Sequence, residues 1–141
     1  DSGAKVIVTQ DGVMRGGKLV QLKGILDGAM PLIEAQGGAI VKSIVLQRLG
    51  SEECLATMEM KEGRDVWWHD FTATMSVQCA TEWLDAEAPS FILYTSGSTG
   101  KPKGILHTTG GYLLGAATSF KYTFDTQEGD IFHNLSYYSF H

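Results

Sequence analysis

The sequence has 141 residues, which is enough for one domain with a hydrophobic core and not obviously enough for two. With 43% hydrophobic and 19% charged residues, its composition is that of a globular protein and argues against global disorder. The net charge of −5 argues against a nucleic-acid partner held by bulk charge. Because the sequence begins with Asp1 rather than Met, we expect a fragment or a processed product.

The cysteines and the lengths of the apolar runs bear on the cellular compartment of the protein. Cys54 and Cys79 stand in no metal-ligand spacing and are expected to be reduced thiols. No apolar run reaches the ~18–20 residues of a membrane-spanning helix. No basic-then-apolar signal segment opens the sequence. We therefore expect a cytoplasmic protein without a membrane partner, with a plastid or another organelle as the open alternative.

The first part of the chain predicts a strand, a turn and a helix. Residues 5–9 form a β-branched run that ends at the turn residues Asp11-Gly12. A basic, glycine-containing turn follows at 14–18. Apolar residues at helical spacing then predict a helix over 19–30, with Pro31 near its end.

The middle of the chain predicts one strand among less regular segments. Residues 43–46 read as a buried strand, and 50–64, rich in Glu and Lys, as a surface segment. Residues 66–71 are an aromatic cluster that must be buried or bind something. A short helix is expected over 72–77, and 85–89 is an acidic connector.

The last predicted elements surround a loop of small residues. Phe91–Thr95 is an apolar strand, and the Gly/Ser/Thr loop follows it directly. Beyond the loop, apolar residues at 112–120 trace one face of a helix, which Thr108 or Thr109 could cap. Strands that alternate with helices predict an α/β fold with a mostly parallel sheet and flanking helices.

The loop at 96–104, Ser-Gly-Ser-Thr-Gly-Lys-Pro-Lys-Gly, has the groups that phosphate binding needs. Its glycines let the backbone approach an anion and point N–H groups at it. Its hydroxyls donate hydrogen bonds, and Lys101 and Lys103 add positive charge. The P-loop of common nucleotidases has Ser or Thr after Gly-Lys, whereas Pro102 stands here. A flexible surface loop is the alternative interpretation.

This loop resembles the hallmark of the adenylate-forming superfamily, which includes acyl-CoA synthetases, luciferases and peptide-synthetase adenylation domains. The flanking segments 85–94 and 106–113, and Gly-Arg-Asp-Val-Trp-Trp at 63–68, resemble the acetyl-CoA synthetases. The resemblance covers residues 1–132 and implies a fragment of the AMP-binding domain, a piece of the large N-terminal domain of that fold. Residues 133–141 depart abruptly from the family pattern. This divergent tail suggests read-through, a frameshift or a truncated gene model.

The resemblance implies how ATP would be held. In that family a carboxylate attacks the α-phosphorus of ATP, which gives an acyl-adenylate and pyrophosphate, and coenzyme A then displaces AMP. The loop would hold the β- and γ-phosphates of ATP, with Mg²⁺ expected alongside but no metal ligand named. The implied ATP-phosphate residues are Thr95, Ser96, Gly97, Ser98, Thr99, Gly100, Lys101, Lys103 and Gly104.

A second implied site is the basic turn Arg15-Gly16-Gly17-Lys18, which resembles an Arg-x-Gly-Arg turn that contacts the phosphates of coenzyme A. Lys18 replaces the second arginine, so the charge is kept and bidentate geometry is lost. A solvated turn is the alternative. Trp67 and Trp68 are expected to pack in a core or between subdomains, with a ligand platform as the alternative. His69 and His107 are expected to be structural, and no catalytic residue is assigned.

The function implied by the resemblance is that of an acetate–CoA ligase fragment using ATP, coenzyme A and acetate, with propionate as the alternative acid. We expect these residues to be inactive alone, because no adenine-, ribose- or adenylation-lysine segment is found among them. The alternatives are a non-catalytic module that binds ATP or coenzyme A phosphate, and an interaction fragment that pairs with a full-length synthetase. An uncovered sheet edge also predicts self-association.

Overall fold

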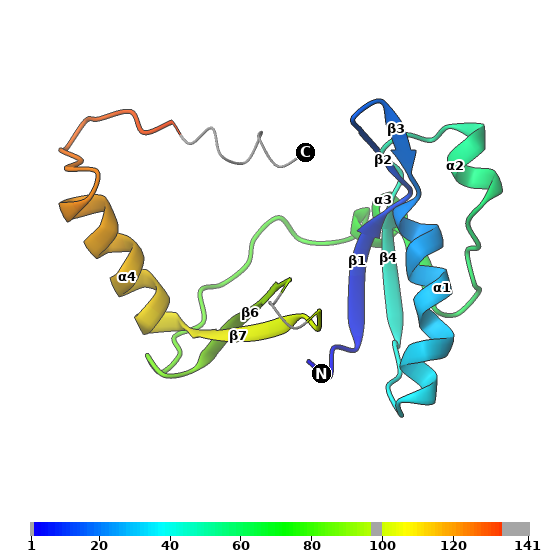
Figure 1. The fold of residues 1–141 in the computed structure, drawn as a ribbon, viewed down its shortest axis with the longest axis horizontal. Helices are drawn as coiled ribbons and strands as arrows, with labels where there is room; N and C mark the ends of the chain where they lie inside the picture. Colours follow the sequence, from blue (N-terminus) through cyan, green and yellow to red (C-terminus); the bar gives the residue numbers. More distant parts are fainter. Residues whose placement is uncertain (1, 97–99, 134–141) are drawn as a thin grey trace. The chain divides into compact units, whose positions relative to one another are not determined.

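The computed structural model describes residues 2–96 and 100–133 (Figure 1). The chain divides into two compact units, one up to Gln78 and one from Cys79 on, and each is described by itself. The predicted divergent tail lies outside the described residues from position 134 onward, and so do Gly97, Ser98 and Thr99 of the loop. Within the described ranges, no helix is both long and apolar enough to cross a membrane.

The first unit is built on a three-stranded parallel sheet. Its strands are β1 (Val6–Gln10), β4 (Lys42–Leu46) and β5 (Asp65–Trp67), in the order β1-β4-β5. The predicted strands at 5–9 and 43–46 are confirmed. Because β4 is paired on both edges, it supplies most of the buried side chains of the sheet, with Val45 fully buried.

Helix α1 (Leu22–Ala35) connects β1 to β4, as a parallel pair requires (Figure 1). The predicted helix over 19–30 is wrong at both ends: Leu19 belongs to a strand, and the helix continues through Pro31. Proline removes one backbone donor. Packing of the helix against the sheet, with Met30 buried, offsets this loss, because tertiary burial contributes more to a helix than propensity does.

The basic turn is the tip of a hairpin. Strands β2 (Val13–Arg15) and β3 (Lys18–Val20) pair antiparallel around Gly16-Gly17. The φ angles of these two glycines are 55° and 75°, the left-handed values that a tight two-residue turn requires. The predicted turn is confirmed, whereas the two short strands that flank it were not predicted.

Residues 50–77 contain two short helices that differ from the predicted elements of this segment. Helix α2 (Glu52–Ala56) lies within the predicted surface segment, and its Cys54 is buried. A methyl group on Gly12 would lie 2.7 Å from Cys54 Sγ, so the helix packs closely beneath the hairpin. Helix α3 (Trp68–Thr72) ends where the predicted helix over 72–77 was to begin. That prediction is wrong because no apolar side chain there is buried to support a helix.

The second unit consists of a hairpin and a helix. Strands β6 (Pro89–Thr95) and β7 (Lys103–Thr108) pair antiparallel, and helix α4 (Thr109–Tyr122) follows β7. The apolar strand and the helix are confirmed. The loop, however, leads into a strand and not directly into the helix. The strand is also not buried, since every β6 residue except Phe91 is exposed.

The start of α4 is held by backbone carbonyls. The N–H groups of Thr109 and Gly110 donate to the carbonyl oxygens of Ala88 and Ala86, at 3.0 and 2.9 Å. Thr108 is the cap residue but its side chain makes no capping hydrogen bond, and the Thr109 hydroxyl donates to Ala88. The predicted threonine side-chain cap is therefore wrong. The acidic connector folds back as a turn and satisfies these donors instead.

Candidate functional sites

The hairpin turn brings the two predicted coenzyme A cations together. Arg15 and Lys18 are directly opposite each other in the β2–β3 register, and both side chains are exposed. Residues opposite each other in an antiparallel pair have Cβ atoms roughly 5 Å apart on one face. Two like charges so placed repel each other. In the described part of the chain, neither side chain forms an ion pair. An anion is therefore the partner that this arrangement favours.

The carboxylate of Asp11 holds the base of this hairpin. It is 1% exposed and accepts hydrogen bonds from four backbone N–H groups. The shortest two, from Gly12 and Gly50, are both 2.7 Å. The N–H of Asp11 also donates to Leu46, and its carbonyl accepts from Lys23 at the start of α1. One residue thereby joins the end of β1, the loop after β4 and the first turn of α1.

The environment of Asp11 favours its ionised form. Burial by itself raises the pKa of this carboxyl, but the four backbone N–H donors, with Gly50 first, lower the pKa below its ordinary value. The charged carboxylate is thus the form that organises this end of the sheet.

A second buried network ties α1 to β5. The side chains of Lys23 and Asp65 are 0% exposed, and Lys23 Nζ lies 3.0 Å from Asp65 Oδ2. Lys23 also pairs with Asp27 one helical turn on. Arg64 donates from Nε and Nη2 to the two oxygens of Asp65, at 2.6 and 2.8 Å, and from Nη2 to Asp27 at 3.2 Å.

The pKa of Asp65 is strongly shifted by this network. Burial raises the pKa, but hydrogen bonds from Arg64, the Lys61 N–H and Lys23, together with the Lys23 charge, lower it from 3.8 to about 2. Each buried charge is therefore paired, which is the condition under which buried ions are tolerated. The network fixes α1, which follows the hairpin directly.

The predicted ATP loop closes the β6–β7 hairpin of the second unit. Thr95 and Lys103 form the last pair of the register before the loop. Gly100 has a φ of 77°, the left-handed conformation expected for a glycine that turns the chain toward an anion. Thr95, Ser96, Gly100, Lys101 and Lys103 are exposed, and in the described ranges neither lysine forms an ion pair. These groups are free to contact a ligand in solution.

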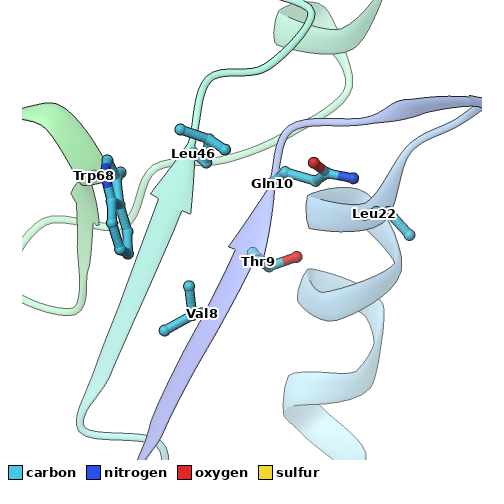
Figure 2. Close-up of a pocket in the computed structure, with 6 residues that line it drawn as sticks. All are labelled: Val8, Thr9, Gln10, Leu22, Leu46 and Trp68. Atoms are coloured by element: carbon cyan, nitrogen blue, oxygen red, sulfur yellow. The ribbon is translucent and has the colours of Figure 1, made fainter. Parts of the chain in front are cut away.

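A pocket of about 420 Å³ opens beside the carboxyl end of β1 (Figure 2). Its lining residues are Val8, Thr9, Gln10, Leu22, Leu46 and Trp68. None of these side chains carries a charge. No predicted site residue lines it. Trp68, which was expected to pack in a core or between subdomains, is 39% exposed and lies at the rim of this pocket.

The described histidines take no visible part in a reaction centre. His107 stacks on Phe91 with ring centroids 4.8 Å apart, and Tyr112 packs edge-on against both rings. This aromatic cluster attaches α4 to the β6–β7 hairpin. Across the described residues, no group of three His, Cys, Asp or Glu side chains gathers as metal ligands would.

Comparison with known families assigns the chain. The model of the family described as AMP-binding enzyme matches residues 1–141. The chain belongs to the AMP-binding enzyme family. The predicted family and the predicted α/β fold class are therefore confirmed.

Curated relatives of this AMP-binding chain are acetyl-coenzyme A synthetases. That of Photobacterium profundum is 52% identical over 132 residues, which cover 94% of this chain and 19% of that protein. The Serratia proteamaculans protein is 48% identical over 134 residues, with the same coverage. The Drosophila melanogaster protein is 45% identical over 138 residues, covering 94% of this chain and 21% of that protein. The chain spans about a fifth of the length of these relatives.

Residue patterns alone did not reveal the groups that brace the AMP-binding chain. Asp11 was interpreted only as a turn residue. Lys23 and Asp27 lie within the predicted amphipathic helix, and no role was predicted for them. Two signals were available. Lys23 and Asp27 have the i, i+4 spacing of a helical ion pair, and Asp65 lies in the family-like Gly-Arg-Asp segment. Neither signal shows that these charges meet in the interior.

The Asp65 network predicts an acid-labile first unit. Because the folded pKa of Asp65 lies below its unfolded value, its stabilisation is present above about pH 3.8 and is lost as the pH falls toward about 2. The shift corresponds to roughly 2 kcal/mol. Tryptophan fluorescence during acid titration should show loss of structure in this window. Asp65→Asn should unfold more readily at pH 7, and the exposed carboxylate variant Asp70→Asn should match wild type. Equal acid midpoints and equal stability for all three proteins would contradict the assignment.

Proposed function

We propose that the protein containing this chain is an acetate–CoA ligase, which forms acetyl-CoA, AMP and pyrophosphate from ATP, acetate and coenzyme A. The observation that carries the proposal is the identity of 45–52% to acetyl-coenzyme A synthetases over 94% of the chain. The two cationic turns support it, because the reaction uses two phosphate-rich substrates. Propionate is the alternative acid, since no acyl-site residue is assigned among the described residues.

In this proposal the β6–β7 loop holds the β- and γ-phosphates of ATP. Lys101 and Lys103 neutralise the charge that develops as pyrophosphate leaves, and the small residues between them and Thr95 offer N–H and hydroxyl donors. Two observations on the described residues support this role: Lys101 and Lys103 are exposed, and neither forms an ion pair within the described ranges.

The hairpin turn of the first unit is proposed to bind the phosphates of coenzyme A through Arg15 and Lys18. The support is their facing position in the register and the left-handed glycines, which leave the tip without side chains. Arg15 can donate two parallel hydrogen bonds to a phosphate, whereas Lys18 acts as a point charge.

Mg²⁺ is proposed to accompany ATP as its phosphate complex. The described residues supply no carboxylate cluster for a bound metal, so no step of the reaction is derived through the ion. The compartment is proposed to be the cytoplasm, which is consistent with two free cysteines, one buried and one exposed.

The loop assignment predicts a specific loss in the first half-reaction. In the intact protein, Lys103→Ala should lower acetate-dependent ATP–pyrophosphate exchange by roughly a hundredfold, because a positioned charge on the leaving pyrophosphate is lost. Lys121→Ala is the matched control, since Lys121 lies at the far end of α4 and contacts only the Tyr122 ring among the interactions described. An exchange rate for Lys103→Ala within twofold of wild type would remove the loop from the proposal.

The hairpin assignment predicts a loss confined to the second half-reaction. Arg15→Ala should raise the KM for coenzyme A about tenfold, the cost of one charge-assisted hydrogen bond, and should leave ATP–pyrophosphate exchange unchanged. Lys18→Arg should keep or improve the affinity. Lys5→Ala, an exposed cation at the opposite end of β1, controls for charge. If exchange and the KM for coenzyme A change together, the hairpin acts on folding and not on coenzyme A.

Residues 1–141 are proposed to be insufficient for catalysis by themselves and to self-associate. Strand β1 is an edge of its sheet, and Val6 and Val8 on it are 51% and 61% exposed. Parallel sheets are normally covered on both faces, and an open edge can pair with another chain.

The isolated 141-residue chain should therefore be inactive in ATP–pyrophosphate exchange and should elute above its monomer mass in size-exclusion chromatography. Measurable exchange would show that it holds a complete adenylation site. A monomer with a sharp cooperative melt would contradict self-association. Binding of ATP without exchange would favour the non-catalytic module, and co-purification with an intact synthetase would favour the interaction fragment.

A further inference from the structure

The hairpin that carries the ATP loop contains a tightly packed cross-strand pair. Tyr94 is opposite Gly104 in the register, one pair before Thr95 and Lys103. Tyr94 is 47% exposed, and its hydroxyl makes no hydrogen bond to any residue described. The ring, and not the hydroxyl, is thus the part of Tyr94 that contacts the hairpin.

Gly104 leaves room for this ring. A methyl group built on Gly104 would lie 3.1 Å from both Cε1 and Cζ of Tyr94, and 3.0 Å from Cγ2 of Ile92. These distances are closer than carbon atoms normally approach. The φ of Gly104 is not in the left-handed region, so backbone conformation is not the reason for a glycine here. The aromatic ring of one strand instead covers the bare backbone of the other.

The packing fixes which face of the hairpin receives Lys103. Tyr94 and Gly104 share one face, and the next pair, Thr95 and Lys103, lies on the other because side chains alternate along a strand. A slip of one residue would move Lys103 to the opposite face. At the other end of β6 the register already shifts between Pro89 and Phe91, so the pairing is not uniformly regular.

We propose that Tyr94 is a positioning residue for the ATP loop, which acts by packing its ring over Gly104 and so setting the register that presents Lys103 to the phosphates. This inference rests on the proposed function of the loop. Tyr94 itself does not touch the nucleotide in this account. Its contribution is geometric, and a displacement of about 1 Å in a catalytic group is enough to change a rate by orders of magnitude.

The test uses the intact protein and the KM for ATP in acetate-dependent ATP–pyrophosphate exchange. Tyr94→Ala should raise the KM for ATP roughly tenfold and leave the KM for acetate within twofold. Tyr94→Phe should restore the wild-type KM, because the ring is kept. Leu106→Ala is the matched control, since Leu106 lies on the same face of β7, two pairs further from the loop than Gly104, and is also exposed.

A double-mutant cycle separates the ring–glycine contact from general damage to the hairpin. Gly104→Ala should raise the KM for ATP on its own. In the Tyr94→Ala background its additional effect should be smaller, because the ring is gone and only Cγ2 of Ile92 still meets the new methyl group. Independent effects of the two substitutions, or a Tyr94→Phe protein as impaired as Tyr94→Ala, would overturn the inference.

The two proposals fail in different ways. If the wild-type protein shows no acetate-dependent exchange, the proposed function is wrong. If the wild type is active and Lys103→Ala is impaired while Tyr94→Ala keeps its KM for ATP, only the positioning role is wrong. An equal rise in KM for Leu106→Ala would also reject that role, because any loss of packing in the hairpin would then suffice.

Discussion

The buried carboxylate of Asp11 is the interaction on which the first unit depends. Its oxygens accept the N–H groups of Gly12 and of three residues in the loop after β4, while its backbone joins β4 and α1. A charge that is 1% exposed is tolerated only because every one of these donors points at it. The hairpin with Arg15 and Lys18 begins two residues later, so its base is held by a fixed point in the sheet. The Lys23–Asp65 ion pair also anchors the first turn of this helix.

The two cationic turns are supported in different ways. The turn that we propose to bind coenzyme A rises from a unit whose anchors are buried ions and which contains a parallel sheet. The loop that we propose to bind ATP closes an antiparallel hairpin in which most side chains are exposed, and we propose that local cross-strand contacts such as Tyr94 over Gly104 set its geometry. Both turns leave their cations without carboxylate partners in the described part of the chain.

Local sequence patterns predicted several strands, a turn and a helix of this molecule, but not the features that depend on contacts between segments distant in the chain. The strands at 5–9 and 43–46, the glycine turn and the final helix were readable because β-branched runs, glycine pairs and helical periodicity act over short spans. Strand β7 was missed because its pairing with β6 is a contact across a loop. The helix end at Pro31 was misjudged because burial of Met30 outweighed a local breaker. The predicted threonine cap was wrong because the first N–H groups of α4 donate to the carbonyl oxygens of Ala86 and Ala88, about 20 residues earlier in the chain.

The family and the chemical character of the two turns could be read from the residues alone, because the glycine, hydroxyl and lysine content of a segment does not depend on its fold. The folded chain was needed to show that Arg15 faces Lys18 across a two-residue turn, that Lys103 is paired with Thr95, and that Asp11 and Asp65 are buried ions. The physical reason is that register and burial are set by contacts between segments far apart in the chain. An aspartate in a sequence does not show whether its carboxylate will be exposed in a surface turn or buried with hydrogen bonds from four backbone N–H groups.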